Sequence, residues 1–520
     1  MFYNSSNSFE YNDCISRGAC SVSPTISSMQ EVMFILLRQI AFYTLKLRDF
    51  NLSSKKIIDE IIFQIAFIDA AKDFTEKQIL EAFSRQYSNL VQSRKEYLKL
   101  CKEKNLKCED LKNLIKLSPK TNLSEILKRG DREYLHKYKK ANLDKKYYIE
   151  ILSGVMKSVC VNLVTLNEYN CECEIAVSNI LNTLNLFNSS RVQINKIKKH
   201  IDELAYCDLE ILKLINDSQI KLYGKPEQTE VSHSTKPNKA IMVSGSDLSD
   251  LKNLLLATKD LDIDIYTNGN LLIAHAFPYF KSFKNLVGHF GSGVFNTILD
   301  FATFPGAILL TQNEAQNIEY LYRGRLFTTD EITPKGVVKI ENNDFNPLIN
   351  SALQAKGFAK GQKRASEIVG IDEKSLNSEL DKIIKKNPNK IYIIGHSNLS
   401  IQNFDYLKKF FDKIDKNDYA ITFSYNPHKE NVLAINIGND YAILYGILRK
   451  IFEKIPANSD NLEFCLTKCD INSLSNIINL KNKGVKNIYL SDCPPLVINP
   501  AVLRAFNKMF DVKQMKPQNT

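Results

Sequence analysis

The sequence lacks the features of an exported or membrane-spanning protein. Its first residues, MFYNSSNSFEYND, are polar and contain none of the basic, apolar and small-residue zones of a signal peptide. Its most apolar local runs, such as VMFILL at residues 32–37, are far shorter than the roughly 20 residues that a helix needs to cross a bilayer. We therefore expect a soluble, cytoplasmic protein that does not enter a membrane.

Common catalytic and metal-binding motifs are also missing. No GxSxG, HExxH or paired CxxC occurs, so the standard hydrolase and zinc signatures are absent. The stretch GHFGSG at residues 288–293 has neither the GxGxxG spacing of a dinucleotide site nor the basic residue of a P-loop. The histidines never recur at i, i+4. Only His396 follows an apolar run that we expect to be a strand, and α/β proteins place sites at the carboxyl ends of strands.

The cysteines give no disulfide framework. The chain has 11, an odd number scattered at irregular spacing, so reduced thiols are expected. Three close groupings occur, but without a second pair nearby none predicts a metal site. Cys171 and Cys173 are interpreted as ordinary reduced thiols. The other two groupings are Cys14 with Cys20 and Cys465 with Cys469.

Charge and size indicate a multidomain globular protein. The 69 basic and 58 acidic residues give a net charge of +11, spread through the chain rather than gathered in one arm. Such an excess is typical of a solvated lysine surface, and we expect no nucleic-acid partner. With 520 residues and 44% apolar content, the chain exceeds what one core usually holds, so several domains are expected.

Apolar spacing divides the chain into a helical part and an α/β part. From residue 28 to 223 apolar residues recur at helical spacing with almost no glycine or proline, and a break near Pro119 predicts two bundles. The polar segment 224–240 carries two prolines and marks a boundary. After it, short apolar runs alternate with helical segments, as in a parallel, doubly wound sheet. These runs are AIMVSG, DIDIYTNG and GAILLTQN, then IYIIG, YAITFSY, NVLAIN and NIYLSD.

A lysine-rich helical interval at residues 350–389 separates the two groups of strands. The predicted fold is therefore an N-terminal helical bundle domain at 1–225, followed by two Rossmann-like α/β domains with parallel sheets at 226–370 and 371–520.

Three stretches resemble the hybrid-cluster protein family, the prismane or hydroxylamine reductase group, in order and spacing. They are MVSGSDLSDLKNLLL, IDIYTNGNLLIAHAFPYFKSFKNLVGHFG with FPGAILLTQN, and NKGVKNIYLSDCPPLVINPAVLRAF, and RGRLFTTDEITPKGV at residues 323–337 is similar to a further family segment. The resemblance implies a helical domain followed by two Rossmann-like domains. It also implies a four-iron cluster at the amino terminus and a mixed sulfur/oxygen iron cluster between domains, where hydroxylamine or nitric oxide is reduced.

The residues that the family uses as ligands of the mixed cluster are replaced here. SGHDL of the family reads SGSDL, with Ser246 in place of a histidine, and YTHGE reads YTNGN, with Asn268 for a histidine and Asn270 for the ligating glutamate. Neutral side chains at these positions remove metal affinity. The remaining ligand positions, by the same resemblance, fall on Glu314, His396, Asn426, Gly438 and Asp470.

The amino-terminal cluster positions are only half kept. The first two cysteines of the family match Tyr3 and Ser6, whereas Cys14 and Cys20 match the last pair. Two thiolates alone do not satisfy a cubane, whose irons take four cysteines. A cluster completed by outside ligands or by another subunit stays open.

The favoured hypothesis is a family member that has lost the hybrid cluster, holds no cofactor, and acts as a binding or regulatory scaffold. The alternative is an oxidoreductase that reduces hydroxylamine or nitric oxide with an altered site of one or two metal ions, held by Glu314, His396 and Asp470 with Cys469 or Cys493 nearby. In a third interpretation, Ser246, Asn268 and Asn270 orient a small organic ligand, or merely satisfy a buried loop. The partner, a small molecule or a protein, and the oligomeric state are left open.

Overall fold

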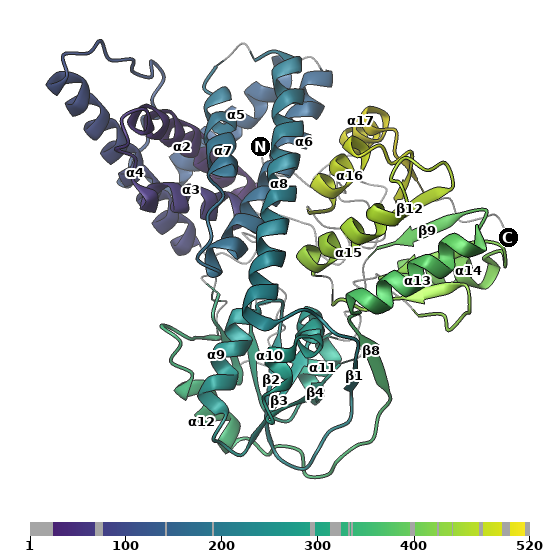
Figure 1. Cartoon of the computed structure of the whole chain (residues 1–520). Coiled ribbons are helices and arrows are strands. Elements are labelled where there is room, and N and C mark those ends of the chain that lie inside the picture. Colours follow the sequence, from purple (N-terminus) through teal and green to yellow (C-terminus); the bar gives the residue numbers. More distant parts are fainter. Residues whose placement is uncertain are drawn as a thin grey trace. The chain divides into compact units, whose positions relative to one another are not determined.

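The computed structural model describes most of the chain (Figure 1). The described residues are 24–67, 76–140, 143–189, 192–291, 297–311, 324–330, 333, 336–395, 401–423, 426–438, 440–466, 472–490 and 500–514. They form two compact units. The first, called the helical unit below, comprises Met1–Ile211, Cys469–Asn479 and Pro495–Asp511; the second, the sheet unit, comprises Leu212–Lys468, Leu480–Pro494 and Val512–Thr520.

The helical unit is built on α2, whose apolar residues recur at helical spacing and are buried on several sides. Val32, Leu36 and Ile40 are completely inaccessible to solvent, and α2 contacts α4, α5 and α7 while α3 contacts α6. Burial of this kind supplies most of the stability of a helix in a protein. The helices are α2 (Pro24–Arg48), α3 (Lys55–Phe67), α4 (Glu76–Glu103), α5 (Leu123–Lys140), α6 (Leu143–Glu168), α7 (Glu174–Leu186) and α8 (Ile194–Tyr223).

Two segments from the end of the chain complete the helical unit. Helix α17 (Pro500–Phe510) packs on α6, and the first part of α16 (Asn472–Asn482) contacts α8. There the Asn479 amide donates to the Ala205 carbonyl over 2.6 Å. The predicted boundaries at residues 225 and 370 stay predictions. The structure groups residues 469–479 and 495–511 with the N-terminal helices, which the predicted boundaries do not include.

A buried carboxylate lies among these helices. Asp208 on α8 accepts hydrogen bonds from Ser158 Oγ over 2.9 Å and from Asn162 Nδ2 over 2.8 Å, both on α6. Burial raises the pKa of Asp208 to about 6, and the hydrogen bonds from Asn162 and Ser158 oppose that rise.

One described helix passes a length and composition test for a membrane span. It is Lys145–Glu168, within α6, and 72% of its most apolar window is buried inside the protein. Because α6 packs against α3 and α17, its apolar surface already faces protein. The helix therefore reads as a core helix.

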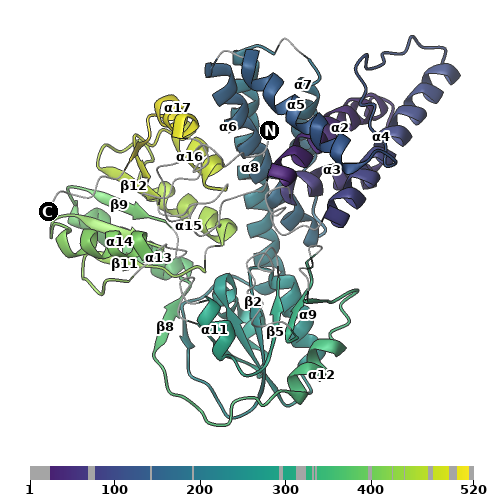
Figure 2. The same cartoon turned by 180° about the vertical axis from the view of Figure 1, so that it is seen from behind.

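The sheet unit contains two six-stranded parallel sheets with the same strand order. The first runs β4-β3-β2-β5-β6-β7 and the second β11-β10-β9-β12-β13-β14. In each, the first strand along the chain lies in the middle and the order reverses beside it, as in doubly wound folds. The predicted fold class is confirmed (Figure 2).

Short apolar runs made seven of these strands predictable, and those of the first sheet are almost fully buried because both faces of that sheet are covered. The runs AIMVSG, DIDIYTNG and GAILLTQN form β2 (Lys239–Ser244), β3 (Ile263–Asn268) and β5 (Ala307–Leu310), and the other four form β9 (Ile391–Ile394), β10 (Tyr419–Thr422), β11 (Val432–Ala434) and β13 (Asn487–Leu490). The remaining strands of the two sheets are β4 (Leu286–His289), β6 (Leu326–Thr328), β7 (Val338–Lys339), β12 (Leu462–Leu466) and β14 (Lys513–Gln514).

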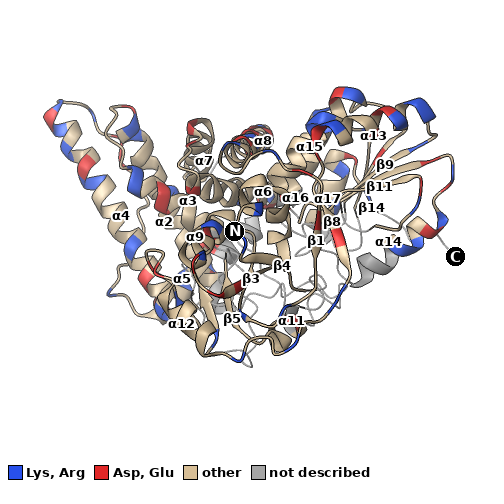
Figure 3. Ribbon diagram, turned by 60° about the horizontal axis from the view of Figure 1, so that its bottom comes forward, with Lys and Arg blue, Asp and Glu red and all other residues tan. Residues whose placement is uncertain are grey.

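Short helices and one ribbon connect the strands. Strand β1 (Thr229–Ser232) pairs antiparallel with β8 (Ser366–Val369) in a two-stranded ribbon. In the sequence, β1 precedes the strands of the first sheet and β8 follows them. The helices are η3 (Gly269–Ala276, a 3-10 helix), α9 (Leu248–Thr258), α10 (Pro278–Lys281), α11 (Thr297–Thr303), α12 (Asn346–Gln354), α13 (Glu373–Lys386), α14 (Ile401–Lys413) and α15 (Tyr441–Lys454). Lys and Arg are interleaved with Asp and Glu along many of these elements (Figure 3).

One cysteine prediction is wrong. Cys101 and Cys108 form a disulfide, although the sequence predicted reduced thiols throughout. Their spacing of seven residues spans a helix end, where the chain turns back, and sequence spacing alone does not reveal such a return. In the described part no disulfide joins Cys171 to Cys173, and Cys160, Cys173, Cys207 and Cys465 are free thiols.

Candidate functional site

The candidate site lies at the carboxyl ends of β2 and β3, next to the point where the strand order of the first sheet reverses. Ser244 ends β2 and Asn268 ends β3, and the two residues are paired in register. Strand β5 pairs with the other side of β2, and the Thr311 amide donates to the Ser244 carbonyl over 2.9 Å. Parallel strands place their ligands at this edge.

The Asn268 side chain links neighbouring strands of the first sheet by hydrogen bonds. Its Oδ1 accepts from Ser244 Oγ over 2.7 Å, and its Nδ2 donates to the Phe290 carbonyl over 2.7 Å. The side chain is only 4% exposed. Both ends of the amide are therefore engaged within the protein, which favours the interpretation that Asn268 satisfies a buried loop over the one in which it orients a ligand.

A network of histidines lies beside Asn268. Thr267 Oγ1 is 2.9 Å from His275 Nε2 and 2.8 Å from His289 Nδ1, and all three side chains are buried. One hydroxyl donates a single proton, so one imidazole accepts from Thr267 and the other donates to it. Burial lowers the pKa of His275 to about 4 and holds that of His289 well below its usual value. Both rings are therefore neutral near pH 7.

The network continues to the ribbon and to the second sheet. The His233 ring lies perpendicular to that of His289, with centroids 5.4 Å apart, and His233 Nε2 is 2.7 Å from Glu367 Oε1. Glu367 Oε2 accepts from Asn436 Nδ2 over 2.7 Å. Sequence reasoning missed this network, because its members come from distant segments and share no periodic spacing.

Gly438 contacts the loop that follows β3. Its φ of 58° lies in the left-handed region, and its amide donates to Asn436 Oδ1 over 3.1 Å. A Cβ at this position would lie 2.5 Å from the Asn270 carbonyl oxygen and 3.1 Å from the Ile273 nitrogen. Carbon atoms do not approach backbone atoms that closely, so this backbone leaves no room for a side chain at position 438.

A group of carboxylates follows β2 and β6. Asp247 caps α9 by accepting from the amides of Ser249 over 2.7 Å and Asp250 over 3.0 Å. Asp250 Oδ2 accepts from Thr329 Oγ1 over 2.5 Å. Burial, followed by the nearby charges of Asp247 and Asp330, raises the pKa of Asp250 to about 8.

Replacing Asp250 is expected to remove a pH dependence of stability. A raised pKa means that stability is present at low pH and is lost as the pH rises through about 8, where the folded protein must ionise Asp250. Asp250→Asn keeps an acceptor for Thr329 without the charge. Between pH 6 and pH 9 the wild-type thermal midpoint should fall more than that of the variant, measured by calorimetry. Asp260→Asn, exposed just beyond α9, is the control; equal slopes for wild type and Asp250→Asn would contradict the assignment.

The structure brings some of the predicted site residues together. Half-buried Ser246 and Asn270 follow β2 and β3, and Gly438 touches the Asn270 backbone. Asn426 is exposed, and its Oδ1 accepts from the His428 amide over 2.9 Å. Tyr3, Ser6, Cys14, Cys20, Glu314, His396, Asp470, Cys469 and Cys493 lie outside the described residues.

Comparison with known proteins decides the family. Residues 10–423 match the model of the Prismane/CO dehydrogenase family. The chain belongs to this family. Hydroxylamine reductase from Thermodesulfovibrio yellowstonii is 26% identical over 530 residues, with 97% of this chain and 96% of the relative covered. Hydroxylamine reductase from Petrotoga mobilis is 24% identical over 550 residues, with 96% and 97% covered.

A comparison with solved structures finds similarity to the closed and open alpha subunits of acetyl-CoA synthase/carbon monoxide dehydrogenase, a structure with NiZn[Fe4S4] and NiNi[Fe4S4] clusters. The TM-score is 0.47 at 10% identity, with 96% of this chain and 82% of that chain covered. The resemblance predicted from the sequence motifs is confirmed by the family match.

The described residues do not fit the ligand set that the Prismane family resemblance implies. Ser246 and Asn270 are neutral where an imidazole and a carboxylate are expected, and position 438 has no room for a thiolate. In the described part of the chain, no three His, Cys, Asp or Glu side chains are arranged to hold a metal ion. A mixed iron cluster needs soft thiolates and charged ligands, which these described positions do not supply.

Proposed function

We propose that this Prismane family member does not hold the hybrid cluster and works as a binding or regulatory scaffold instead of a hydroxylamine reductase. The observation that carries the proposal is the contact of Gly438 with the loop after β3. A Cβ atom at position 438 would lie 2.5 Å from the Asn270 carbonyl oxygen. A thiolate at that position would require the loop to move.

Two further features support the same proposal. Asn270 occupies the position of the expected glutamate. The side-chain amide of the nearby Asn268 is hydrogen-bonded to Ser244 Oγ and to the Phe290 carbonyl. Neutral amides do not balance the charge of several irons. The backbone that surrounds these positions nevertheless keeps the doubly wound edge. The sheet edge that carries the site is therefore retained while the cluster ligands are replaced, which is compatible with a scaffold that binds a different ligand.

The relatives are named for an enzymatic activity, which differs from the scaffold role proposed for this chain. Both full-length relatives are named hydroxylamine reductase, at 24–26% identity. Function resides in site residues rather than in the fold, and at this identity those residues are free to differ. The scaffold proposal therefore rests on the replaced positions, and the shared fold does not conflict with it.

Iron and sulfide content is expected to be low. Anaerobically purified full-length protein should contain less than about one iron per chain and no acid-labile sulfide, because the ligand set is incomplete. Elemental analysis, sulfide determination and an absorption spectrum measure this directly. Hydroxylamine reduction with a reduced dye should stay at the rate without protein.

A matched variant separates the two cluster sites of the family. Cys14→Ser combined with Cys20→Ser removes the remaining cysteine pair at the amino terminus. Iron and sulfide that disappear in this variant would come from that segment; they would contradict the low sulfide content expected above but not the loss of the hybrid cluster. Several irons with sulfide that persist in the variant would overturn it. One or two metal ions without sulfide, lost in Glu314→Ala, would overturn it in favour of the altered-metal oxidoreductase.

The scaffold interpretation also predicts a ligand or partner. A small organic molecule that binds near Ser246 should raise the thermal midpoint of the protein in proportion to the logarithm of its concentration. A panel of metabolites tests this in the full chain. A hit should weaken in Ser246→Ala.

A further inference from the structure

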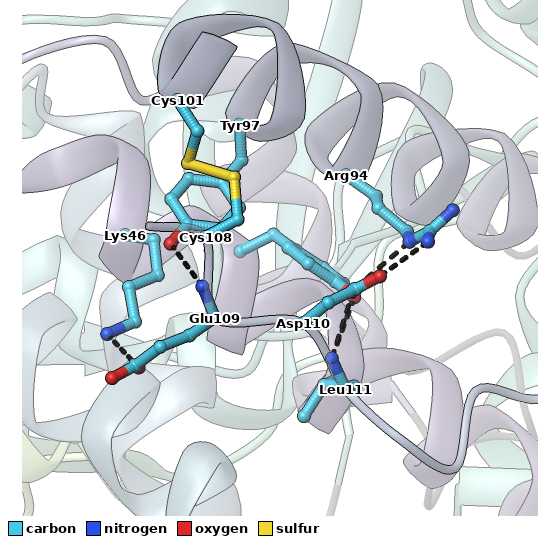
Figure 4. The surroundings of a disulfide bond; sticks show 9 residues. Lys46, Arg94, Tyr97, Cys101, Cys108, Glu109, Asp110 and Leu111 are labelled. Atoms are coloured by element: carbon cyan, nitrogen blue, oxygen red, sulfur yellow. Dashed lines mark hydrogen bonds and ion pairs between the residues drawn. A yellow bond between two sulfur atoms is a disulfide. The ribbon is translucent and has the colours of Figure 1, made fainter. Parts of the chain in front are cut away.

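The Cys101–Cys108 disulfide lies in the helical unit, in a part of the chain separate from the predicted cluster positions. Cys101 is in the last turn of α4 and is 2% exposed, whereas Cys108 is half-buried. Their Cα atoms are 5.8 Å apart, within the ordinary range for a disulfide. The residues between them, KEKNLK, are polar or exposed. Figure 4 shows the bond and its surroundings.

The turn that joins the two cysteines is closed by backbone hydrogen bonds. The Leu106 amide donates to the Cys101 carbonyl over 2.8 Å, and the Lys104 amide donates to Leu100 over 2.9 Å. Asn105, with a φ of 51°, ends the helix in the left-handed conformation that such caps use. These bonds order the turn up to Leu106, two residues before Cys108, without help from the disulfide. The dithiol and the disulfide can share one backbone.

The segment that follows Cys108 is tied to two helices. The Glu109 amide donates to Tyr97 Oη on α4 over 3.3 Å, and Glu109 Oε2 lies 2.6 Å from Lys46 Nζ on α2. Asp110 accepts from Arg94 of α4, with Nε to Oδ1 at 3.1 Å, and from the Tyr43 hydroxyl of α2. These contacts hold residues 108–111 across α2 and α4 (Figure 4).

Further contacts extend this attachment along α2. The Gln39 side chain donates to the Asn113 carbonyl over 2.9 Å and accepts from the Ile115 amide over 3.1 Å. Residues 108–115, called the strap below, thus cross α2 with polar contacts at each end. A covalent bond at Cys108 adds a fixed point at the start of the strap. Its presence or absence changes how freely the turn and the strap open.

We propose that Cys101 and Cys108 are a reversible redox site, a dithiol that two-electron oxidants of the hydroperoxide class convert to the disulfide and that small thiols reduce again. The half-buried Cys108 is the sulfur that an oxidant reaches first. Oxidation locks the turn at the end of α4 to the strap. Reduction leaves the strap held by its noncovalent contacts, which include those of Glu109, Asp110 and Gln39.

The chemistry balances without any cofactor. The Cys108 thiolate attacks one oxygen of the hydroperoxide and breaks the O–O bond, which gives a sulfenic acid and releases an alcohol or water. The Cys101 thiolate then attacks the Cys108 sulfur, forms the S–S bond and expels the hydroxyl as water. Two electrons pass from the sulfurs to the peroxide. In the reverse direction, two molecules of a small thiol become one disulfide and both cysteines regain their protons.

The test uses the full-length protein in its folded form. Samples are equilibrated anaerobically in glutathione buffers of graded ratio or exposed to hydrogen peroxide, quenched in acid, unfolded, alkylated and digested. We expect the linked Cys101–Cys108 peptide to rise with the oxidising ratio and to vanish at the most reducing one. Amide hydrogen exchange of residues 104–111 should be about tenfold slower in the oxidised form.

Controls make the outcome decisive. Cys108→Ser should abolish the response, whereas Cys171→Ser, also half-buried in the helical unit, should leave it intact. A linked peptide that survives the most reducing ratio in folded protein would overturn the proposal, since the bond would then be a fixed structural disulfide. Cysteines that stay reduced under peroxide would overturn it as well. So would exchange rates that are equal in the two forms.

Discussion

Gly438→Ala is expected to lower the free energy of unfolding of the sheet unit by about 2–4 kcal/mol. About 1 kcal/mol arises because alanine is unfavourable in the left-handed conformation, and the rest because its Cβ meets the Asn270 carbonyl. Denaturant unfolding, followed by hydrogen exchange of peptides from β3 and η3, measures the loss where it occurs. Gly438→Cys should cost at least as much and should bring no iron.

Gly484→Ala is the matched control. Gly484 also has a positive φ, 93°, but its Cβ would meet only the Asn458 side chain at an ordinary 3.4 Å. It should therefore lose only about 1 kcal/mol, the backbone contribution. Equal losses at the two positions would mean that the Asn270 loop yields readily, and the space argument against a ligand at position 438 would fail.

Asp208→Asn is expected to stabilise the helical unit at neutral pH. The folded pKa of about 6 is above the usual value near 4, so the stability that Asp208 provides is complete below pH 4 and is lost as the pH rises through 6. At pH 7 this loss amounts to about 3 kcal/mol in the wild type. The variant avoids it, because its amide can accept from Asn162 and donate to Ser158 Oγ.

Unfolding at pH 4.5 and pH 7.5 tests this prediction. The wild type should gain stability relative to the variant on going to the lower pH, as followed by hydrogen exchange of peptides from α6 and α8. Asp217→Asn, exposed on the same helix, controls for the loss of a negative charge. If wild type and Asp208→Asn respond to pH in parallel, the carboxylate is not the group that titrates.

Seven of the twelve strands in the two sheets were predictable because they read as short apolar runs, most of them covered on both faces. The short strand β7, whose two residues are exposed and half-buried, offers no such run and was missed. The attachment of α17 to α6 also escaped prediction, because it depends on a contact between segments more than 300 residues apart, as the bounds of the two helices show.

The candidate site was predictable in position but not in detail. Strand ends and family motifs located Ser246, Asn268, Asn270 and Gly438 at one edge of the sheet unit. They did not reveal that Asn268 is hydrogen-bonded between strands, or that the Asn270 carbonyl leaves no room for a side chain at position 438. Both features depend on which atoms of distant segments lie next to these residues. The Thr267 histidine network is of the same kind. Its hydrogen bonds join segments that the sequence separates.

The antiparallel ribbon of β1 and β8 makes the first parallel sheet an insertion in the chain. Isolated pairs Thr235 with Gln362 and Asn238 with Phe358 continue the ribbon toward that sheet, so the chain enters and leaves through adjacent strands. Residues 233–365 therefore begin and end at neighbouring points. The segment can be excised at the ribbon and closed with a short turn, or expressed alone with its ends joined, which allows the two halves of the sheet unit to be studied as separate pieces.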